Sequence, residues 1–157
     1  MTRRDDFDFL FGSWQIKNTF LKKRLQGCEE WETFTSTGTA QPILGGLGNI
    51  DDFVAPEWRP DFIGMTLRLF DLVTQQWSIY WMSNATGRLE PPVIGVFKDG
   101  VGIFNGQDML DGKPIRVRFT WSGITSETAL WEQEFSGDNG VSWEKNWIMQ
   151  FTRKDTP

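Results

Sequence analysis

The side chains that most often do chemistry in proteins are scarce in this sequence. Histidine is absent, and Cys28 is the only cysteine among the 157 residues. These two facts exclude zinc, copper or haem held by histidine, Ser-His and Cys-His catalytic triads, and metal sites built from several cysteines. We therefore expect no cofactor and no transition-metal site, and a disulfide within the chain is impossible.

The charge balance bears on the possible partners. Twenty-one acidic residues outnumber sixteen basic ones, which gives a formal net charge of -5. A net negative charge disfavours non-specific binding to nucleic acid and to anionic membranes. No stretch approaches the ~18 consecutive apolar residues of a membrane-spanning helix. We expect no nucleic-acid partner and no membrane insertion.

Aromatic residues are the most abundant candidates for a binding site. Nine tryptophans and thirteen phenylalanines accompany a single tyrosine. Such rings can fill a core, or they can line a pocket in which a few polar groups orient a ligand. The predicted walls of that pocket are Trp81, Trp131, Phe135 and Met149, and its predicted polar anchors are Asn105, Gln133 and Arg153. The expected ligand is a small hydrophobic or amphipathic molecule.

A second hypothesis is an enzyme that acts on such a molecule, as an isomerase, cyclase or lyase. Without histidine, a carboxylate buried in the pocket would have to serve as acid or base, and the candidates are Asp108 and Glu90. A third hypothesis, glycan processing, rests on the tryptophans and on Ser136–Trp143, which matches the Asp-box pattern Ser-x-Asp-x-Gly-x-x-Trp of sialidase-like propellers. A single copy is more typical of a structural hairpin in which Asp138 binds the turn backbone.

Short strands must position these residues. Turn sequences such as Asp99-Gly100 and Asp111-Gly112 recur between apolar or alternating runs and favour tight hairpins. Helical periodicity is limited to one short turn, Asp5–Leu10, for which Asp5 or Asp6 is the expected cap. The ten predicted strands span 13–24, 29–41, 47–54, 61–71, 75–84, 92–98, 101–110, 113–122, 127–136 and 142–153.

Regular short strands without long helices predict an all-β fold, either a sandwich or a barrel. We favour a single antiparallel up-and-down β-barrel of about eight to ten strands, because an aromatic interior of this size suits a small barrel. The chain length corresponds to one domain, so the barrel is expected to span 1–157.

Alternation assigns the faces of the later strands. After residue 113 the odd positions carry most of the large apolar side chains, so the odd face is predicted to point inward. The same reasoning places Lys145 inside the barrel. In the strand 101–109 it places Asn105 and Gln107 on an inward face between two apolar residues.

The outer faces carry charges and one apolar run. Arg116 and Arg118 are expected opposite Glu132 and Glu134 as cross-strand pairs, which favours a solvated ladder over a catalytic pair of carboxylates. The segment 77–82 is apolar on both faces. We expect its outer face to be covered by a second copy of the chain in a homodimer.

The two ends of the chain resemble lipocalins. Phe7–Trp14 is similar to the opening of a lipocalin-type barrel, where a short turn leads to Gly-x-Trp at the start of the first strand. The resemblance implies a calycin-like barrel whose closed end is plugged by Trp14. It further implies that Gly12 begins the first strand and that Arg153 packs over the tryptophan from the last strand.

The whole chain also resembles a bacterial family of lipocalin-like proteins. That family shares Phe-Asp-Phe-Leu-x-Gly-x-Trp, a Pro-Ile-Leu-Gly-Gly segment and a terminal aromatic-x-Arg, which correspond here to Phe7–Trp14, Pro42–Gly46 and Phe151–Arg153. The chain lacks the Thr-Asp-Tyr element and the disulfides of secreted lipocalins, and no signal-like apolar run follows Arg3-Arg4. We therefore expect a cytoplasmic protein.

Overall fold

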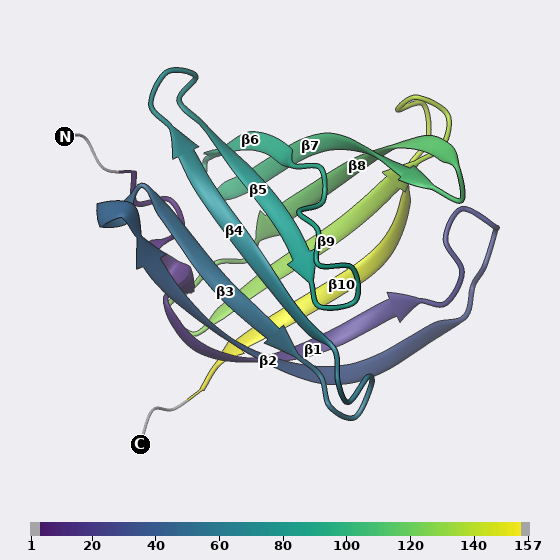
Figure 1. The fold of residues 1–157 in the computed structure, drawn as a ribbon, viewed down its shortest axis with the longest axis horizontal. Helices are drawn as coiled ribbons and strands as arrows, with labels where there is room; N and C mark the ends of the chain where they lie inside the picture. The colour runs from purple at the N-terminus through teal and green to yellow at the C-terminus, as the bar shows by residue number, and fades with distance from the viewer. Residues whose placement is uncertain (1–3, 155–157) are drawn as a thin grey trace.

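Ten antiparallel strands form a closed barrel in the computed structural model, which describes residues 4–154 (Figure 1). Each strand pairs with the next along the chain, and β1 closes the barrel by pairing with β10. The strands are β1 (Gly12–Leu21), β2 (Trp31–Ile43), β3 (Gly48–Val54), β4 (Ile63–Asp71), β5 (Gln76–Ser83), β6 (Val93–Lys98), β7 (Val101–Leu110), β8 (Lys113–Ser122), β9 (Thr128–Ser136) and β10 (Glu144–Arg153). The predicted all-β, up-and-down barrel is confirmed.

Helical structure in the described part of the chain is limited to two short 3-10 turns, η1 (Asp8–Leu10) and η2 (Leu44–Gly46). None of the helical segments found there is long and apolar enough to span a membrane. The turn at η1 lies within the predicted Asp5–Leu10, but the expected aspartate cap is wrong. Phe7 occupies the N-cap position and makes no side-chain cap hydrogen bond. The Asp6 carboxylate accepts a hydrogen bond from Trp77 instead.

Two of the predicted hairpins follow directly from their turn residues. Asp99 and Gly100 connect β6 to β7, and Asp111 and Gly112 connect β7 to β8. All four residues have positive φ angles, between 51° and 79°. Two successive positive φ angles define the type I′ turn, whose twist matches that of the flanking strands. Local sequence therefore sets the register of three neighbouring strands.

Trp14 and Arg153 close one end of the barrel. Trp14 on β1 lies opposite Arg153 on β10 in the strand register. Trp14 is 1% exposed, and its Nε1 donates a hydrogen bond of 2.7 Å to the Leu10 carbonyl. The Arg153 guanidinium lies 4.2 Å from the centroid of the indole ring. It also donates hydrogen bonds to the carbonyl oxygens of Phe9 and Phe11, each at 2.6 Å. The stacking that the lipocalin resemblance implies is confirmed.

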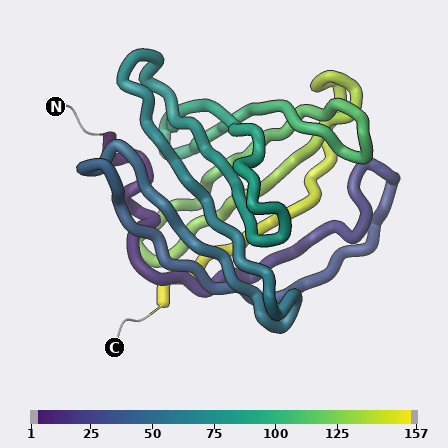
Figure 2. Tube along the Cα trace, in the orientation of Figure 1, coloured from purple at the N-terminus to yellow at the C-terminus, as the bar shows by residue number. Residues whose placement is uncertain are grey.

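Gly12 is required at this closed end by two features. Its φ of +107° is a conformation that side chains rarely adopt, and a Cβ there would lie 2.8 Å from Nη1 of Arg153. Figure 2 shows the first and last described segments, in purple and yellow, meeting at this end of the barrel. The first and last strands are therefore joined at the closed end by the stacked Arg153 as well as by their own pairing.

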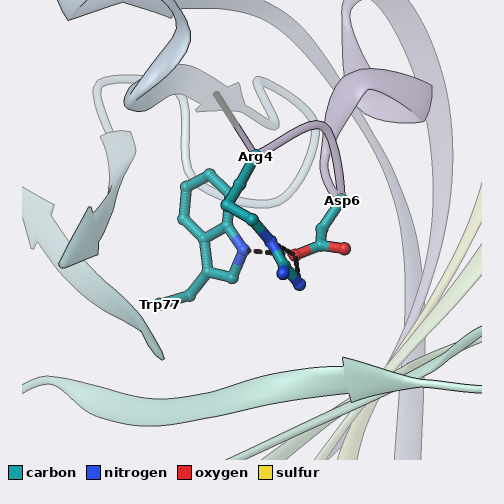
Figure 3. Close-up of polar contacts among 3 residues, drawn as sticks. All are labelled: Arg4, Asp6 and Trp77. Carbon is teal, nitrogen blue, oxygen red and sulfur yellow. Dashed lines mark hydrogen bonds and ion pairs between the residues drawn. The ribbon is translucent and has the colours of Figure 1, made fainter. Parts of the chain in front are cut away.

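The segment before η1 is attached to the barrel by the half-buried carboxylate of Asp6 (Figure 3). Oδ2 of Asp6 accepts a hydrogen bond of 2.9 Å from Nε1 of Trp77, which lies on β5. The same oxygen accepts from Nε and Nη2 of Arg4, at 3.1 and 2.8 Å. Phe7 then packs edge-on against the Trp77 ring, with centroids 4.9 Å apart. The N-terminal segment thus forms part of the core at the closed end.

The faces predicted for β8 and β9 are confirmed, but the face predicted for β7 is wrong. Asn105 and Gln107 are exposed, whereas Phe104 is fully buried. Two glycines explain the reversal, because the inward face of β7 carries Gly102 and Gly106 beside Phe104 and so looks less apolar than the outer face. Exposed Ile103 and Met109 lie on that outer face.

A bulge in β10 changes another predicted face. The register against β9 shifts between Lys145 and Trp147, which leaves Asn146 as an additional buried residue. Lys145 consequently points outward and forms an ion pair with Glu132. Its predicted inward position is therefore wrong.

The outer ladder of charges is partly as expected. Arg118 lies opposite Glu134 and pairs with it at 3.2 Å, as predicted. Arg116 instead lies opposite Ser136. Glu132 finds its cation on β10, so neither of these two glutamates faces the interior.

The apolar surface lies on different strands from those we expected. Of the inward residues in the 77–82 segment, Trp77 and Ile79 are buried and Trp81 is half-buried at the cavity wall, and the outward side chains are half-buried within the chain itself. Exposed apolar residues gather instead on β6 and β7: Ile94, Val96, Val101, Ile103 and Met109. The homodimer stays a prediction.

We predict that Trp14→Ala will lower the free energy of unfolding by about 3–5 kcal/mol, since it removes a fully buried ring and leaves Arg153 without its stacking partner. Urea denaturation monitored by circular dichroism measures this. The matched control is Trp31→Ala, because Trp31 is 39% exposed. Its loss should cost less than about 1 kcal/mol. Equal losses for the two variants would contradict the role given to the closed end.

Candidate functional site

The barrel encloses a cavity of about 240 Å³ that extends from Trp14 at the closed end to Arg24 in the β1–β2 connection. Successive strands run in opposite directions, so the connections after β1, β3, β5, β7 and β9 all lie at the end away from Trp14. We call this end the open end. Apolar cavities of about 150 Å³ already accept a benzene ring. This cavity therefore has room for a small ring system.

Aromatic rings form one side of the cavity. Trp131 on β9 packs edge-on against Phe119 on β8, with centroids 4.9 Å apart, and against Trp147 on β10 at 5.8 Å. The lining also includes two small residues of β2, Gly38 and Ala40. A Cβ at Gly38 would lie 2.4 Å from the Asp52 carbonyl oxygen, so no side chain can fill that position. These two positions leave space inside the barrel.

Five of the seven predicted site residues line this cavity, namely Trp81, Trp131, Gln133, Phe135 and Met149. The other two lie elsewhere. Asn105 is exposed on the outer face of β7, beside Arg116 and Trp143. Arg153 lies at the closed end, where its guanidinium is occupied by the Trp14 ring and by backbone carbonyls. Its expected role as a polar anchor is replaced by this structural role.

Gln133 is the predicted anchor that does reach the cavity. Its Nε2 donates a hydrogen bond of 2.9 Å to Oδ1 of Asn146, the residue that the β10 bulge turns inward. Nδ2 of Asn146 is buried without a hydrogen-bond partner among the described residues. The hydrogen bond to Asn146 thus fixes the orientation of the Gln133 side chain at the cavity wall.

Arg68 is an interior charge that the sequence reasoning missed. It lies on β4, is 4% exposed and lines the cavity. Its Nη1 donates to Oδ1 of Asn49 at 2.9 Å and lies 2.8 Å from a carboxylate oxygen of Asp51, both on β3. Its Nε is buried with no hydrogen-bond partner in the described part of the chain. Alternation in β3 places Asn49 and Asp51 on the same face as Phe53. This pattern could have indicated polar partners for an interior cation.

Two further arginines that the sequence reasoning missed meet at the open end. The Arg24 guanidinium is half-buried and lies over the rings of Phe20 and Phe135, at 5.5 and 5.6 Å from their centroids. Arg59, in the β3–β4 connection, lies 4.0 Å from the Trp58 ring centroid. Burial lowers the pKa of Arg24 most, the charge of Arg59 lowers it further, and Asp111 acts in the opposite direction. The two like charges are therefore close enough to repel each other.

The cavity reaches the surface beside β7. Only three residue pairs join β5 to β6, from Trp77–Gly95 to Ile79–Val93, and β6 pairs with β7 no further than Gly106. The chain between β5 and β6 folds back instead, and the Glu90 amide donates to the Trp81 carbonyl at 2.8 Å. The half-buried carboxylates of Glu90 and Asp108 both line the cavity. Both candidates of the enzyme hypothesis therefore lie at the cavity wall.

The Asp-box segment forms a structural turn. Oδ1 of Asp138 accepts hydrogen bonds of 2.8 Å from the Ser142 amide and from the Ser136 hydroxyl. The Ser142 hydroxyl donates to Oδ2 of the same carboxylate. This hydrogen bond most of all, together with the other two, lowers the pKa of Asp138 from 3.8 to about 2. Asp138 is occupied within the β9–β10 hairpin and lies outside the cavity lining. No group of three or more metal-binding side chains was found among residues 4–154.

Comparison with known proteins identifies a structural likeness without a sequence relative. No protein-family model matches the chain, and no curated protein sequence matches it. The structure is similar to that of the S-type phycobiliprotein lyase CPES from Guillardia theta, with a TM-score of 0.62 and 10% identity over 96% of this chain and 92% of that chain. A redesigned β-barrel aligns over 98% of each chain with 10% identity and a TM-score of 0.39.

The likeness to the lyase shows a shared barrel fold. It supports the fold that the lipocalin resemblance implies. Membership of the bacterial family stays a prediction.

We predict that Arg68→Met will lower the free energy of unfolding by about 3–5 kcal/mol, because it leaves the Asp51 carboxylate buried without its cation. The double variant Arg68→Met/Asp51→Leu should recover most of this loss, since it removes both charges from the interior. Urea denaturation of the two variants tests the pair. A double variant no more stable than the single one would contradict the assignment.

The Asp138 hairpin should be sensitive to acid. Its pKa is lower in the folded chain than the ordinary value of 3.8, so its stabilising effect is complete above about pH 4 and is lost as the pH falls toward 2. We expect the stability difference between the wild type and Asp138→Asn to be constant near neutrality and to shrink over that range. Denaturant titrations at several pH values measure it. A difference independent of pH would exclude this role.

Proposed function

We propose that the barrel binds one small, largely apolar molecule inside its cavity. The observation that carries the proposal is the unfilled space of about 240 Å³ inside the barrel, whose lining includes several aromatic rings and the small residues Gly38 and Ala40. Native cores are normally packed without such voids. A closed barrel that keeps this space therefore suits a ligand better than a purely structural role.

The lining supplies affinity and orientation through different groups. Burial of apolar ligand surface contributes about 25 cal/mol per Å². The rings of Phe119, Trp131 and Trp147 offer flat faces and edges to an aromatic or branched ligand. Gln133 and Arg68 are two of the polar groups at the cavity wall, and each is held by a residue of a neighbouring strand. Few polar groups among many apolar ones is the usual composition of a ligand pocket.

The similar structure adds support at the level of the fold. It belongs to a phycobiliprotein lyase and matches this chain over nearly its whole length. The proposed ligand class rests on the cavity of this chain, since the two sequences are 10% identical.

A second candidate function is catalysis by a carboxylate in the same cavity. The half-buried positions of Glu90 and Asp108 at the cavity wall favour it. A carboxylate at such a place can donate or accept a proton from a bound molecule. If the barrel only binds its ligand, the ligand should be recovered chemically unchanged from the wild type and from the variants Glu90→Gln and Asp108→Asn. Slower turnover of a ligand in these variants would favour the enzyme.

We predict that the neutral fluorophore N-phenyl-1-naphthylamine will bind with one-to-one stoichiometry and quench tryptophan emission. Ala40→Leu should weaken this binding at least about tenfold, equivalent to about 1.4 kcal/mol, because the larger side chain occupies the cavity. Its free energy of unfolding should stay the same or rise, since the void is filled.

Ala85→Leu is the matched control for this experiment. It makes the same substitution at an exposed position that does not line the cavity. Absence of binding to the wild type at tens of micromolar probe would refute the proposed function, as would equal weakening by the two variants.

A further inference from the structure

Five arginines of the described chain are buried or half-buried, and four of them have polar partners. Arg4 pairs with Asp6, Arg68 with Asp51, Arg118 with Glu134, and Arg153 with three backbone carbonyls. The fifth, Arg24, has no hydrogen bond and no carboxylate within 4.0 Å among residues 4–154. It is half-buried, and it lines the cavity.

A second cation adds to this imbalance. Arg59 is close enough to repel Arg24, and it too has no carboxylate within 4.0 Å among those residues. The ring of Trp58 beneath Arg59 is 5.6 Å from the ring of Phe20, over which Arg24 lies. The two guanidinium groups therefore lie over neighbouring rings of one aromatic cluster, at the end of the cavity farthest from Trp14.

This arrangement is unfavourable for the chain alone. Two like charges repel, and partial burial strengthens the repulsion because water screens it less. The chain has 21 acidic residues against 16 basic ones, so acidic partners are plentiful in its composition. Asp111 attracts Arg24 without making an ion pair within 4.0 Å. An anion bound between the two arginines would compensate both charges.

We propose that Arg24 and Arg59 bind the acidic oxyanion group of an amphipathic ligand whose apolar body fills the cavity, an inference that rests on the proposed function. Guanidinium groups present a planar fork of donors that matches carboxylate, sulfonate or phosphate oxygens. Their flat faces remain stacked on the rings beneath while their edges are free to donate. The ligand is then oriented with its apolar end toward Trp14 and its acidic end at the open end.

The half-buried carboxylates of Glu90 and Asp108 lie toward the same open end, but on other parts of the barrel. Glu90 comes from the β5–β6 connection and Asp108 from β7, whereas the arginines come from the β1–β2 and β3–β4 connections. Inside, Arg68 is already neutralised by Asp51 at 2.8 Å. Arg24 lines the cavity and Arg59 lies beside it, and neither guanidinium group has a carboxylate within 4.0 Å among residues 4–154. Glu32 belongs to the same cluster, where its carboxylate accepts a hydrogen bond of 3.1 Å from Nε1 of Trp58.

Two probes with one ring skeleton test the proposal. 1-Anilinonaphthalene-8-sulfonate carries an acidic oxyanion, and N-phenyl-1-naphthylamine is the same skeleton without it. We expect Arg24→Gln to weaken binding of the sulfonate about tenfold and binding of the neutral probe less than about twofold. Arg59→Gln should act in the same direction. Because Arg59 is exposed on a connection, that variant keeps the test valid even if Arg24→Gln fails to fold.

Lys23→Gln is the matched control, since Lys23 is exposed, adjacent in sequence and outside the cavity lining. It makes the same change of charge and should change the affinity of either probe less than about twofold. Equal losses for the two probes in the arginine variants would overturn the oxyanion site and leave the cavity proposal standing. So would unchanged affinity for the sulfonate. Failure of the wild type to bind the neutral probe would instead refute the cavity proposal itself.

Discussion

Closure of the sheet by β1 and β10 is the constraint on which the rest of the structure depends. These strands come from opposite ends of the chain, and their pairing runs from Trp14–Arg153 to Phe20–Trp147. Arg153 secures this seam because it stacks on Trp14 and also donates to carbonyl oxygens before β1 and before β9. A contact between residues so far apart in sequence carries a large loop-closure entropy. The remaining strands need only their local hairpins.

Closure also determines what the interior can do. Once the sheet is a barrel, every inward side chain meets others from across the barrel, and the space left over depends on their sizes. The lining combines tryptophans on β9 and β10 with glycine and alanine on β2, and a cavity remains inside the barrel. Charges inside then fall into two classes. Arg68 is paired with Asp51, whereas Arg24 at the open end has no ion pair within 4.0 Å among residues 4–154.

The sequence was sufficient for the strands, the hairpins and the closed end, because their signals are local or belong to a recognisable motif. Asp99-Gly100 fixes its turn through backbone conformation alone. The face of β7 was misassigned because inward Gly102 and Gly106 leave no apolar signal, while Ile103 is apolar yet exposed. The bulge before Trp147 could not be foreseen, since one extra residue changes the alternation without any marker in composition.

The candidate site was predictable in its walls and not in its charges. Trp131, Gln133 and Phe135 follow from alternation within one strand. Arg24 and Arg59 lie in two connections separated by many residues, and the pairing of β1 to β4 in sequence order brings both connections to the same end of the barrel.

The short pairing between β5 and β6 has a consequence for how the barrel moves. Three residue pairs join these strands, whereas ten join β1 to β2. Beyond Gly106, β7 has no strand beside it on that side. Local opening follows the places with the least hydrogen bonding and packing, so native-state hydrogen exchange would begin along this seam while the other nine remain protected. Separation of β5 from β6 would therefore leave the Trp14 plug and the β1–β10 pairing in place, so the barrel could widen locally without unfolding.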